Sequence, residues 1–327
     1  MTSPVPTDHG PTLELGASEP LLRRLELTVR NRLDGLLQGN YVGLVPGPGS
    51  EAGESRLYTP GDDVRRMDWP VTARTTIPHV RQTIADRELE TWLVVDLSPS
   101  MDFGTALSEK RELVLAAITA VVHLTVRGGN RVGAVVGNGS SVYRIPALGG
   151  RNHARHLVRR IAATARSERG GGPDLASMLD SLRRPPHRRG LVAVVSDFLD
   201  SADLSDPDAP LPWERPLRAL SERHQLLGVE VLDPRELELP AAGLVTFVDT
   251  ESGRELEVQT SAASLRGNYA AAARAQRARI ADALRHAGAG HLQLRTDRDW
   301  INDVVRYVIA RRRVAGPFTA ATGQGFR

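Results

Sequence analysis

The fold of this chain is decided by the stretch Trp92-Leu93-Val94-Val95-Asp96-Leu97-Ser98-Pro99-Ser100-Met101. Its apolar first part is typical of a strand that is buried on both faces of a parallel sheet. Asp96, Ser98 and Ser100 then follow at alternate positions, so in an extended loop their side chains point to the same side. The stretch therefore predicts an α/β fold with a polar site at a strand end, where open sheets bind ligands.

Apolar strands alternate with helical patterns through the rest of the chain, which predicts a doubly wound, mostly parallel sheet. We expect strands at 131–136, 142–145, 191–195, 225–232 and 292–294, with a hairpin over 244–258. We expect helices at 108–126, 151–164, 175–182, 213–222, 262–286 and 299–312. The segment 142–145 is expected to be an edge strand that forms a hairpin.

Upstream of this domain, the sequence predicts a smaller unit. Apolar residues recur at steps of three and four over 21–37, which indicates an amphipathic helix, and short strands are expected near 55–58 and 79–85. The expected organisation is a flexible arm at 1–19, an N-terminal helix and β module at 20–90, an α/β domain at 91–313 and a flexible tail at 314–327.

Composition excludes several classes of function. The chain has 327 residues with 42 basic and 39 acidic side chains, a net charge of +3 that gives no reason to expect nucleic acid. Lys110 is the only lysine, so we interpret the excess of arginine as coding bias. There is no cysteine, which excludes disulfides and thiolate metal sites. No apolar run is long enough for a transmembrane segment and no secretory signal is visible, so we expect a cytoplasmic protein.

A second carboxylate is expected beside the first strand end. Asp197 follows the apolar strand 191–195, and parallel strands bring their carboxyl ends to one edge of the sheet. Carboxylate and hydroxyl oxygens are the ligands that Mg²⁺ prefers. The alternative is that these residues only form turns and helix caps. An aspartyl-phosphate enzyme is disfavoured, because serine stands at position 98 where a second acidic group is expected.

The motif Asp96-x-Ser98-x-Ser100, the glycine-rich turn at 170–172 and Asp197 together resemble the von Willebrand factor A fold with its metal-ion-dependent adhesion site. The resemblance implies a Mg²⁺ ion with one position open for an acidic residue of a partner; Mn²⁺ or Ca²⁺ are alternatives. The fold's second loop normally supplies a threonine, but this chain has Pro173 there. Either Asp174 or a water molecule is the substitute ligand, and an altered, weak or vestigial site is expected.

The upstream stretch Glu54–Trp69, ESRLYTPGDDVRRMDW, resembles the signature of the domain-of-unknown-function 58 family. Members of that family join this module to the A-type fold and are typically encoded beside MoxR-type AAA+ ATPases. The resemblance implies a non-catalytic, metal-dependent adaptor that works with such an ATPase in chaperone-like assembly, remodelling or activation of a client protein complex. The alternatives are a metal-dependent phosphohydrolase or nuclease, and a structural scaffold whose metal site has decayed.

The same stretch concentrates charged residues around one tryptophan. We expect a partner-binding or interdomain surface formed by Asp62, Asp63, Arg65, Arg66, Asp68, Trp69 and Arg74. A second metal site is an alternative, and the favoured interpretation is an internal network of ion pairs and turns that fixes the β module to the large domain and is compatible with an interdomain groove.

Overall fold

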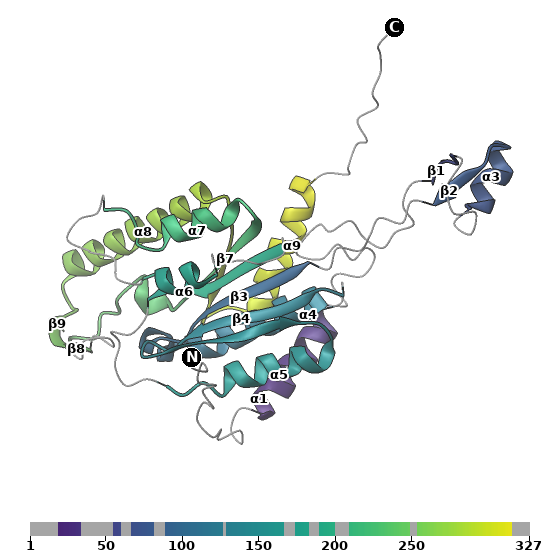
Figure 1. The fold of residues 1–327 in the computed structure, drawn as a ribbon. Helices are drawn as coiled ribbons and strands as arrows, with labels where there is room; N and C mark the ends of the chain where they lie inside the picture. The colour runs from purple at the N-terminus through teal and green to yellow at the C-terminus, as the bar shows by residue number, and fades with distance from the viewer. Residues whose placement is uncertain are drawn as a thin grey trace, which may run out of the picture.

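The computed structural model describes residues 19–33, 55–59, 67–81, 89–126, 129–166, 174–182, 190–199, 209–248 and 254–315. Its centre is a six-stranded sheet with helices on both faces (Figure 1). The strands of this sheet are β3 (Glu90–Asp96), β4 (Arg131–Gly137), β5 (Val142–Leu148), β6 (Gly190–Ser196), β7 (His224–Leu232) and β10 (Gly290–Arg295).

The strand order across the sheet is β10-β7-β6-β3-β4-β5. All neighbours are parallel except β4 and β5, which pair antiparallel at the edge. Numbered within the sheet, this is the order 6-5-4-1-2-3 of doubly wound folds. The predicted doubly wound, mostly parallel sheet and its antiparallel edge strand are therefore confirmed.

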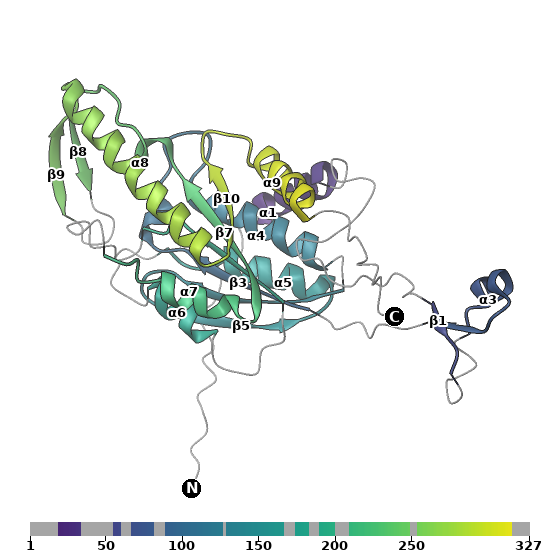
Figure 2. The ribbon, with the colours of Figure 1, turned by 90° about the horizontal axis from the view of Figure 1, so that it is seen from above.

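The buried strands contribute side chains to two hydrophobic cores, one on each face of the sheet, because successive side chains point to opposite faces. Leu93 and Val95 of β3 pack with one set of helices, and Trp92 and Val94 pack with the other. The first face is covered by α1 (Glu19–Thr28), η1 (Val29–Leu33), α4 (Lys110–Val126), α5 (Arg151–Ala162) and α9 (Trp300–Ala315). The second is covered by α6 (Leu175–Ser181), α7 (Glu214–Ser221) and α8 (Ala263–His286), as Figure 2 shows.

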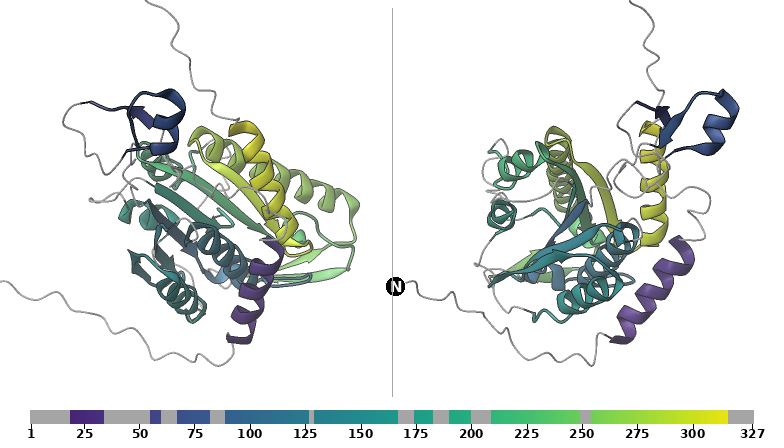
Figure 3. Two further views of the ribbon diagram at one scale, coloured as in Figure 1. Left: turned by 90° about the vertical axis from the view of Figure 1, so that its right-hand side faces the viewer. Right: turned by 45° about the vertical axis from the view of Figure 1, so that its right-hand side comes forward.

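The N-terminal helix packs with the α/β domain. Leu22, Leu25, Val29 and Leu33 are buried in the same core as α4, and Figure 3 shows α1, in purple, beside the helices of this face. This helix of the expected 20–90 module is thus part of the large domain's core. The expected arm and tail overlap the described helices α1 and α9 by one or two residues, and their other residues lie outside the described part.

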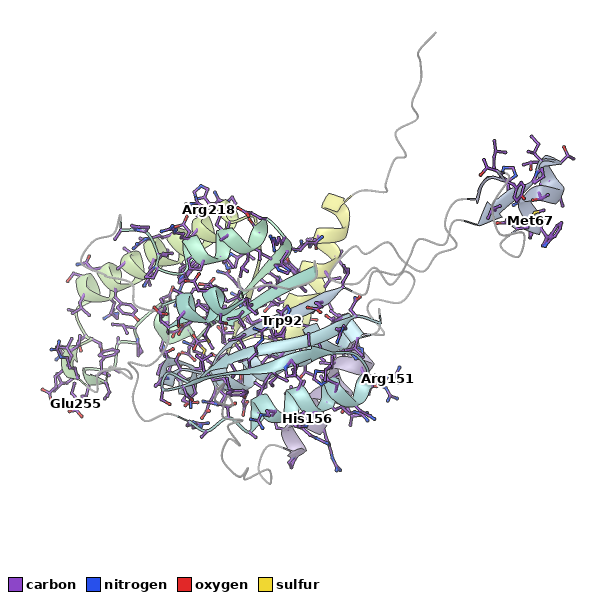
Figure 4. All side chains as sticks on the ribbon, viewed as in Figure 1. Met67, Trp92, Arg151, His156, Arg218 and Glu255 are labelled. Atoms are coloured by element: carbon purple, nitrogen blue, oxygen red, sulfur yellow. The ribbon has the colours of Figure 1, made fainter. Side chains whose placement is uncertain are left out.

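The strands of the expected β module form a separate small unit. β1 (Ser55–Leu57) pairs antiparallel with β2 (His79–Arg81), and α3 (Trp69–Thr75) lies between them in sequence. In Figure 1 this unit lies away from the central sheet, and in Figure 4 its Met67 is far from Trp92 of β3. We did not predict α3, although Asp68 caps it and Pro70 stands in its first turn, which are ordinary signals of a helix start.

Further elements extend the large domain. The predicted hairpin is present as β8 (Leu244–Val248) and β9 (Glu255–Gln259), which pair antiparallel. Two 3₁₀ turns, η3 (Pro99–Asp102) and η4 (Pro234–Glu236), follow the ends of β3 and β7. Among the described residues, no helix has the length and apolarity that crossing a membrane requires.

Candidate functional site

The candidate site lies where the strand order reverses. The chain leaves β3 to form β4 on one side and later returns to form β6 on the other, so the carboxyl ends of β3 and β6 are the topological switch point of the sheet. Asp96 is the last residue of β3, and Asp197 directly follows β6. Both side chains are buried, with 6% and 1% of their residues' surface exposed. The two predicted carboxylates therefore meet at the expected edge.

Asp96 is held by uncharged donors. Its Oδ2 accepts a hydrogen bond from the Ser196 hydroxyl at 2.7 Å, and its Oδ1 accepts one from the Ser98 backbone N–H at 2.9 Å. The pKa of Asp96 is raised to about 6, first by burial and then by the charge of the neighbouring Asp197, while the hydrogen bonds from Ser98 and Ser196 oppose the shift. Among the described residues, no positively charged side chain forms an ion pair with Asp96.

The two predicted serines lie together beside Asp96. The hydroxyls of Ser98 and Ser100 are 3.1 Å apart, and Pro99 begins the 3₁₀ turn that brings Ser100 back towards Ser98. Gly139, in the β4–β5 turn, has a φ of +83°, and a Cβ there would come within 2.8 Å of Pro99. Glycine at this position therefore lets the turn pack against the serine loop.

Asp197 has a very different partner. Its Oδ2 accepts a hydrogen bond from Nζ of Lys110 at 2.8 Å, and the same ammonium donates to Oε1 of Glu236 at 2.5 Å. The Lys110 side chain is fully buried. Burial alone would raise the pKa of Asp197, but the charge and hydrogen bond of Lys110 outweigh it and hold this pKa below its ordinary value. Asp197 is therefore an ionised carboxylate that is already neutralised from within the chain.

The backbone after Asp197 is strained, and an aromatic pair holds it. Phe198 has a φ of +58°, a left-handed conformation that costs of order 1–3 kcal/mol in a residue other than glycine. Its ring packs edge-to-face on Trp213 with the centroids 5.1 Å apart, and its N–H donates to the Ser196 hydroxyl at 3.0 Å. Ser196 thus links the Asp96 carboxylate to this bend.

Further charges extend the network behind Asp197. Arg277 of α8 donates to the Asp197 carbonyl oxygen at 2.9 Å and to Oε1 of Glu230 at 3.1 Å. Oε2 of Glu230 is 2.8 Å from Nε2 of His291. Burial would raise the pKa of Glu230, but the bond to His291 and the charge of Arg277 lower it overall. Helix α8 is in this way tied to the ends of β6 and β7.

A buried carboxylate, Asp233, also holds the segment that directly follows β7. Asp233 accepts hydrogen bonds from the Thr105 hydroxyl at 2.6 Å, the Thr105 N–H at 2.8 Å and the Thr296 hydroxyl at 2.7 Å. Its side chain also caps η4 through the Arg235 N–H. These bonds hold the loop that leads into α4, and with it Lys110, against the end of β7.

The remaining predicted residues have other positions. The Asp174 carboxylate caps α6 by accepting from the Ser177 N–H at 2.8 Å, and Pro173 lies outside the described residues. In the predicted partner surface, Asp68 caps α3, Trp69 is 65% exposed, and the Arg74 guanidinium donates to the Pro70 carbonyl. The other four residues predicted for this surface, Asp62, Asp63, Arg65 and Arg66, lie outside the described part.

We missed Lys110, Glu230, Glu236 and Arg277 in the sequence. Two signals could have identified part of the network. Lys110 is the single lysine among 42 basic residues, and Glu230 interrupts an otherwise apolar strand. Our interpretation of the lysine count as coding bias alone overlooked the position of the one lysine retained.

A cavity of about 450 Å³ lies at the other end of the first face, between α1, α4 and α5. It is lined by apolar side chains, by Thr119 and His123, and by five arginines and one glutamate: Arg23, Arg30, Arg151, Arg155, Arg159 and Glu26. Figure 4 shows Arg151 projecting from α5 on this side. Basic side chains therefore outnumber acidic ones around this groove.

Comparison with known proteins places the chain in a family. An uncharacterized protein of Mycobacterium tuberculosis is 55% identical over 296 residues, which cover 90% of each chain. The solved structure of the conserved hypothetical protein BatB from Bacteroides thetaiotaomicron is 14% identical, covering 68% of this chain and 98% of that one with a TM-score of 0.40. A von Willebrand factor type A protein from Catenulispora acidiphila is 15% identical, covering 44% of this chain and 33% of that one with a TM-score of 0.33. The profile of the family described as "Protein of unknown function DUF58" matches residues 54–279, and the chain belongs to this family.

Proposed function

We propose that this protein is a protein-binding adaptor that engages its partner at the switch point between β3 and β6. The observation that carries the proposal is the convergence of Asp96, Ser98 and Ser100 at the end of β3. A buried carboxylate without a compensating cation, beside two hydroxyls, is suited to binding a positive charge. It is not by itself a set of groups for bond cleavage.

The donor set fits a divalent cation in part. Within the described residues, no group of three or more His, Cys, Asp or Glu side chains is placed to hold a metal ion. Asp96, Ser98 and Ser100 nevertheless offer the hard oxygens that Mg²⁺ prefers, so these three would hold it. We propose the ligand set without Asp197, whose carboxylate pairs with Lys110, and without Asp174, whose carboxylate caps α6. A bound Mg²⁺ with open positions would attract a carboxylate of the partner.

The partner we propose is a MoxR-type AAA+ ATPase, and the role is assembly, remodelling or activation of a client complex. This part rests on the resemblance of the upstream signature and on membership of the family. The groove between α1, α4 and α5 has an excess of arginine and offers acidic proteins a second contact surface.

The experiment is capture of a purified MoxR-type ATPase from the same organism by the full chain, measured in Mg²⁺ and in EDTA. We expect EDTA and the Asp96→Ala variant each to weaken capture about tenfold, the loss of one charge-dependent contact worth about 1.4 kcal/mol. Asp174→Ala, which removes a helix-capping carboxylate, is the matched control and should leave capture unchanged.

Each other outcome identifies a competing function. Capture that is equally strong in EDTA and in Asp96→Ala would show that the metal has no part in binding and would favour the scaffold. Turnover of a phosphoester that disappears in Asp96→Ala would favour the phosphohydrolase or nuclease.

A further inference from the structure

We infer that the Lys110 ammonium is a resident cation of the switch point, which neutralises Asp197 and confines any divalent cation to Asp96, Ser98 and Ser100. The inference rests on the proposed function only for the identity of the metal-binding oxygens. Its own basis is the buried pairing of Lys110 with Asp197 and Glu236.

The position of Lys110 is not explained by helix formation. It is the first residue of α4, where the positive end of the helix dipole disfavours a basic side chain. It is also fully buried, which lysine tolerates only when paired. Both Asp197 and Glu236 supply that pairing, and their charges hold the pKa of Lys110 above its ordinary value although burial lowers it. The residue is therefore placed for its charge.

The choice of lysine over arginine supports the same conclusion. The chain uses arginine at every other basic position, so its coding strongly favours arginine. An ammonium is a compact point charge with three donors, whereas a guanidinium is a planar fork that is larger and binds carboxylates side-on. Only the compact group resembles a small cation in the space between two carboxylates.

Lys110 and a metal ion compete for the same carboxylate. The Asp197 Oδ2 atom is 2.8 Å from the ammonium, and its Oδ1 accepts the Leu199 N–H at 3.1 Å. A divalent cation at Asp197 would lie next to the ammonium and be repelled by it. Removing the charge of Lys110 should therefore release Asp197 and Glu236 as metal ligands and increase the affinity for a divalent cation.

The test measures Mn²⁺ affinity by electron paramagnetic resonance, and the shift in melting temperature caused by Mn²⁺, in the full-length protein. Lys110→Gln keeps much of the side-chain length and removes the charge, while Lys110→Ala opens space for the ion. We expect either variant to bind Mn²⁺ at least tenfold more tightly than the wild type. We also expect Mn²⁺ to restore part of the melting temperature that the variant loses in EDTA.

Arg277→Ala is the matched control, because it removes a buried cation that bonds to the Asp197 carbonyl oxygen and pairs with Glu236 at 3.6 Å, while Lys110 stays on the Asp197 carboxylate. It should lower the melting temperature and leave Mn²⁺ affinity near the wild-type value. The inference is overturned if Lys110→Gln binds Mn²⁺ no more tightly than the wild type, or if Arg277→Ala gains as much affinity. No partner protein is present in this titration, so its result is independent of whether the ATPase is captured.

Discussion

The ends of β3 and β6 carry two buried carboxylates in neighbouring positions, yet their electrostatic states are opposite. Asp96 receives hydrogen bonds only from uncharged groups and has its pKa raised to about 6 by burial. Asp197 is buried as deeply, but Lys110 holds its pKa below the ordinary value. Because both carboxylates are buried, the internal cation Lys110, and not burial, accounts for the opposite directions of their pKa shifts.

The largest effect on this comparison should come from removing the internal cation. Lys110→Met leaves the buried Asp197 and the partly buried Glu236 without their shared ammonium, and breaking a buried ion pair such as Lys110–Asp197 costs about 3–5 kcal/mol. We expect the free energy of unfolding at pH 7, measured by urea denaturation, to fall by that amount.

A double variant separates the pair from the rest of the network. Lys110→Met combined with Asp197→Leu removes both charges, so it should cost clearly less than the sum of the two single changes. If the losses of unfolding free energy simply add, Lys110 does not stabilise the fold through Asp197. The electrostatic difference between Asp96 and Asp197 would then not be due to Lys110.

The pH dependence of stability should have opposite signs at the two carboxylates. The pKa of Asp96 is about 6 in the folded protein against an ordinary 3.8, so its contribution to stability is complete below about pH 4 and is lost as the pH rises through about 6. The change amounts to about 3 kcal/mol. Asp197 has a lowered pKa, so its contribution is present above the ordinary value and is lost in acid, as the pH falls through the folded pKa.

Asp96→Asn tests this sign in EDTA, where no metal can bind to the carboxylate. The unfolding free energy of the variant minus that of the wild type, measured by urea denaturation, should increase by about 3 kcal/mol from pH 4 to pH 8. A difference that stays constant with pH would contradict the raised pKa of Asp96 and make the two carboxylates equivalent.

The half of the site that belongs to β3 could be predicted because it is continuous in sequence. An apolar strand followed by alternating polar residues places Asp96, Ser98 and Ser100 at one strand end, whatever the remaining topology. The fold itself could be predicted for the same reason, since each strand and helix carries its own periodicity. The missed helix α3 is short, and its first turn contains apolar and turn residues that we interpreted as part of a β module.

The half that belongs to β6 depends on tertiary structure. Lys110 and Asp197 are 87 residues apart, and their contact depends on the position of the start of α4 relative to the end of β6. Glu236 and Arg277 join them from η4 and α8, and no spacing rule relates such distant segments. The Asp96-x-Ser98-x-Ser100 motif could thus be identified in the sequence, but the internal partner of Asp197 could not.

Substituting a serine beside Asp96 should have a smaller effect on the unfolding free energy than the changes at the two carboxylates. The Ser98 and Ser100 hydroxyls contact each other, and a hydrogen bond of this kind contributes about 1 kcal/mol net. Ser100→Ala should therefore lower the unfolding free energy by about 1 kcal/mol or less, but weaken Mn²⁺ binding by about tenfold. Unchanged Mn²⁺ affinity would remove Ser100 from the proposed ligands and leave Asp96 as an isolated buried carboxylate.

The smallest effect on the unfolding free energy should come from removing a solvent-exposed ion pair. Such a pair has charge without burial. Arg155 of α5 pairs with Glu26 of α1 at 2.8 Å across the arginine-rich groove, with both side chains about half exposed. Exposed pairs contribute about 0.2–1 kcal/mol and are screened by salt. Arg155→Ala should lower the unfolding free energy by about 0.5 kcal/mol in low salt and less in 0.5 M NaCl. A loss as large as that of Lys110→Met would show that the groove is a structural ion-pair network like the one around Asp197. A small loss would leave Arg155 available for contact with an acidic partner, because little of its charge would be used in holding α1 against the domain.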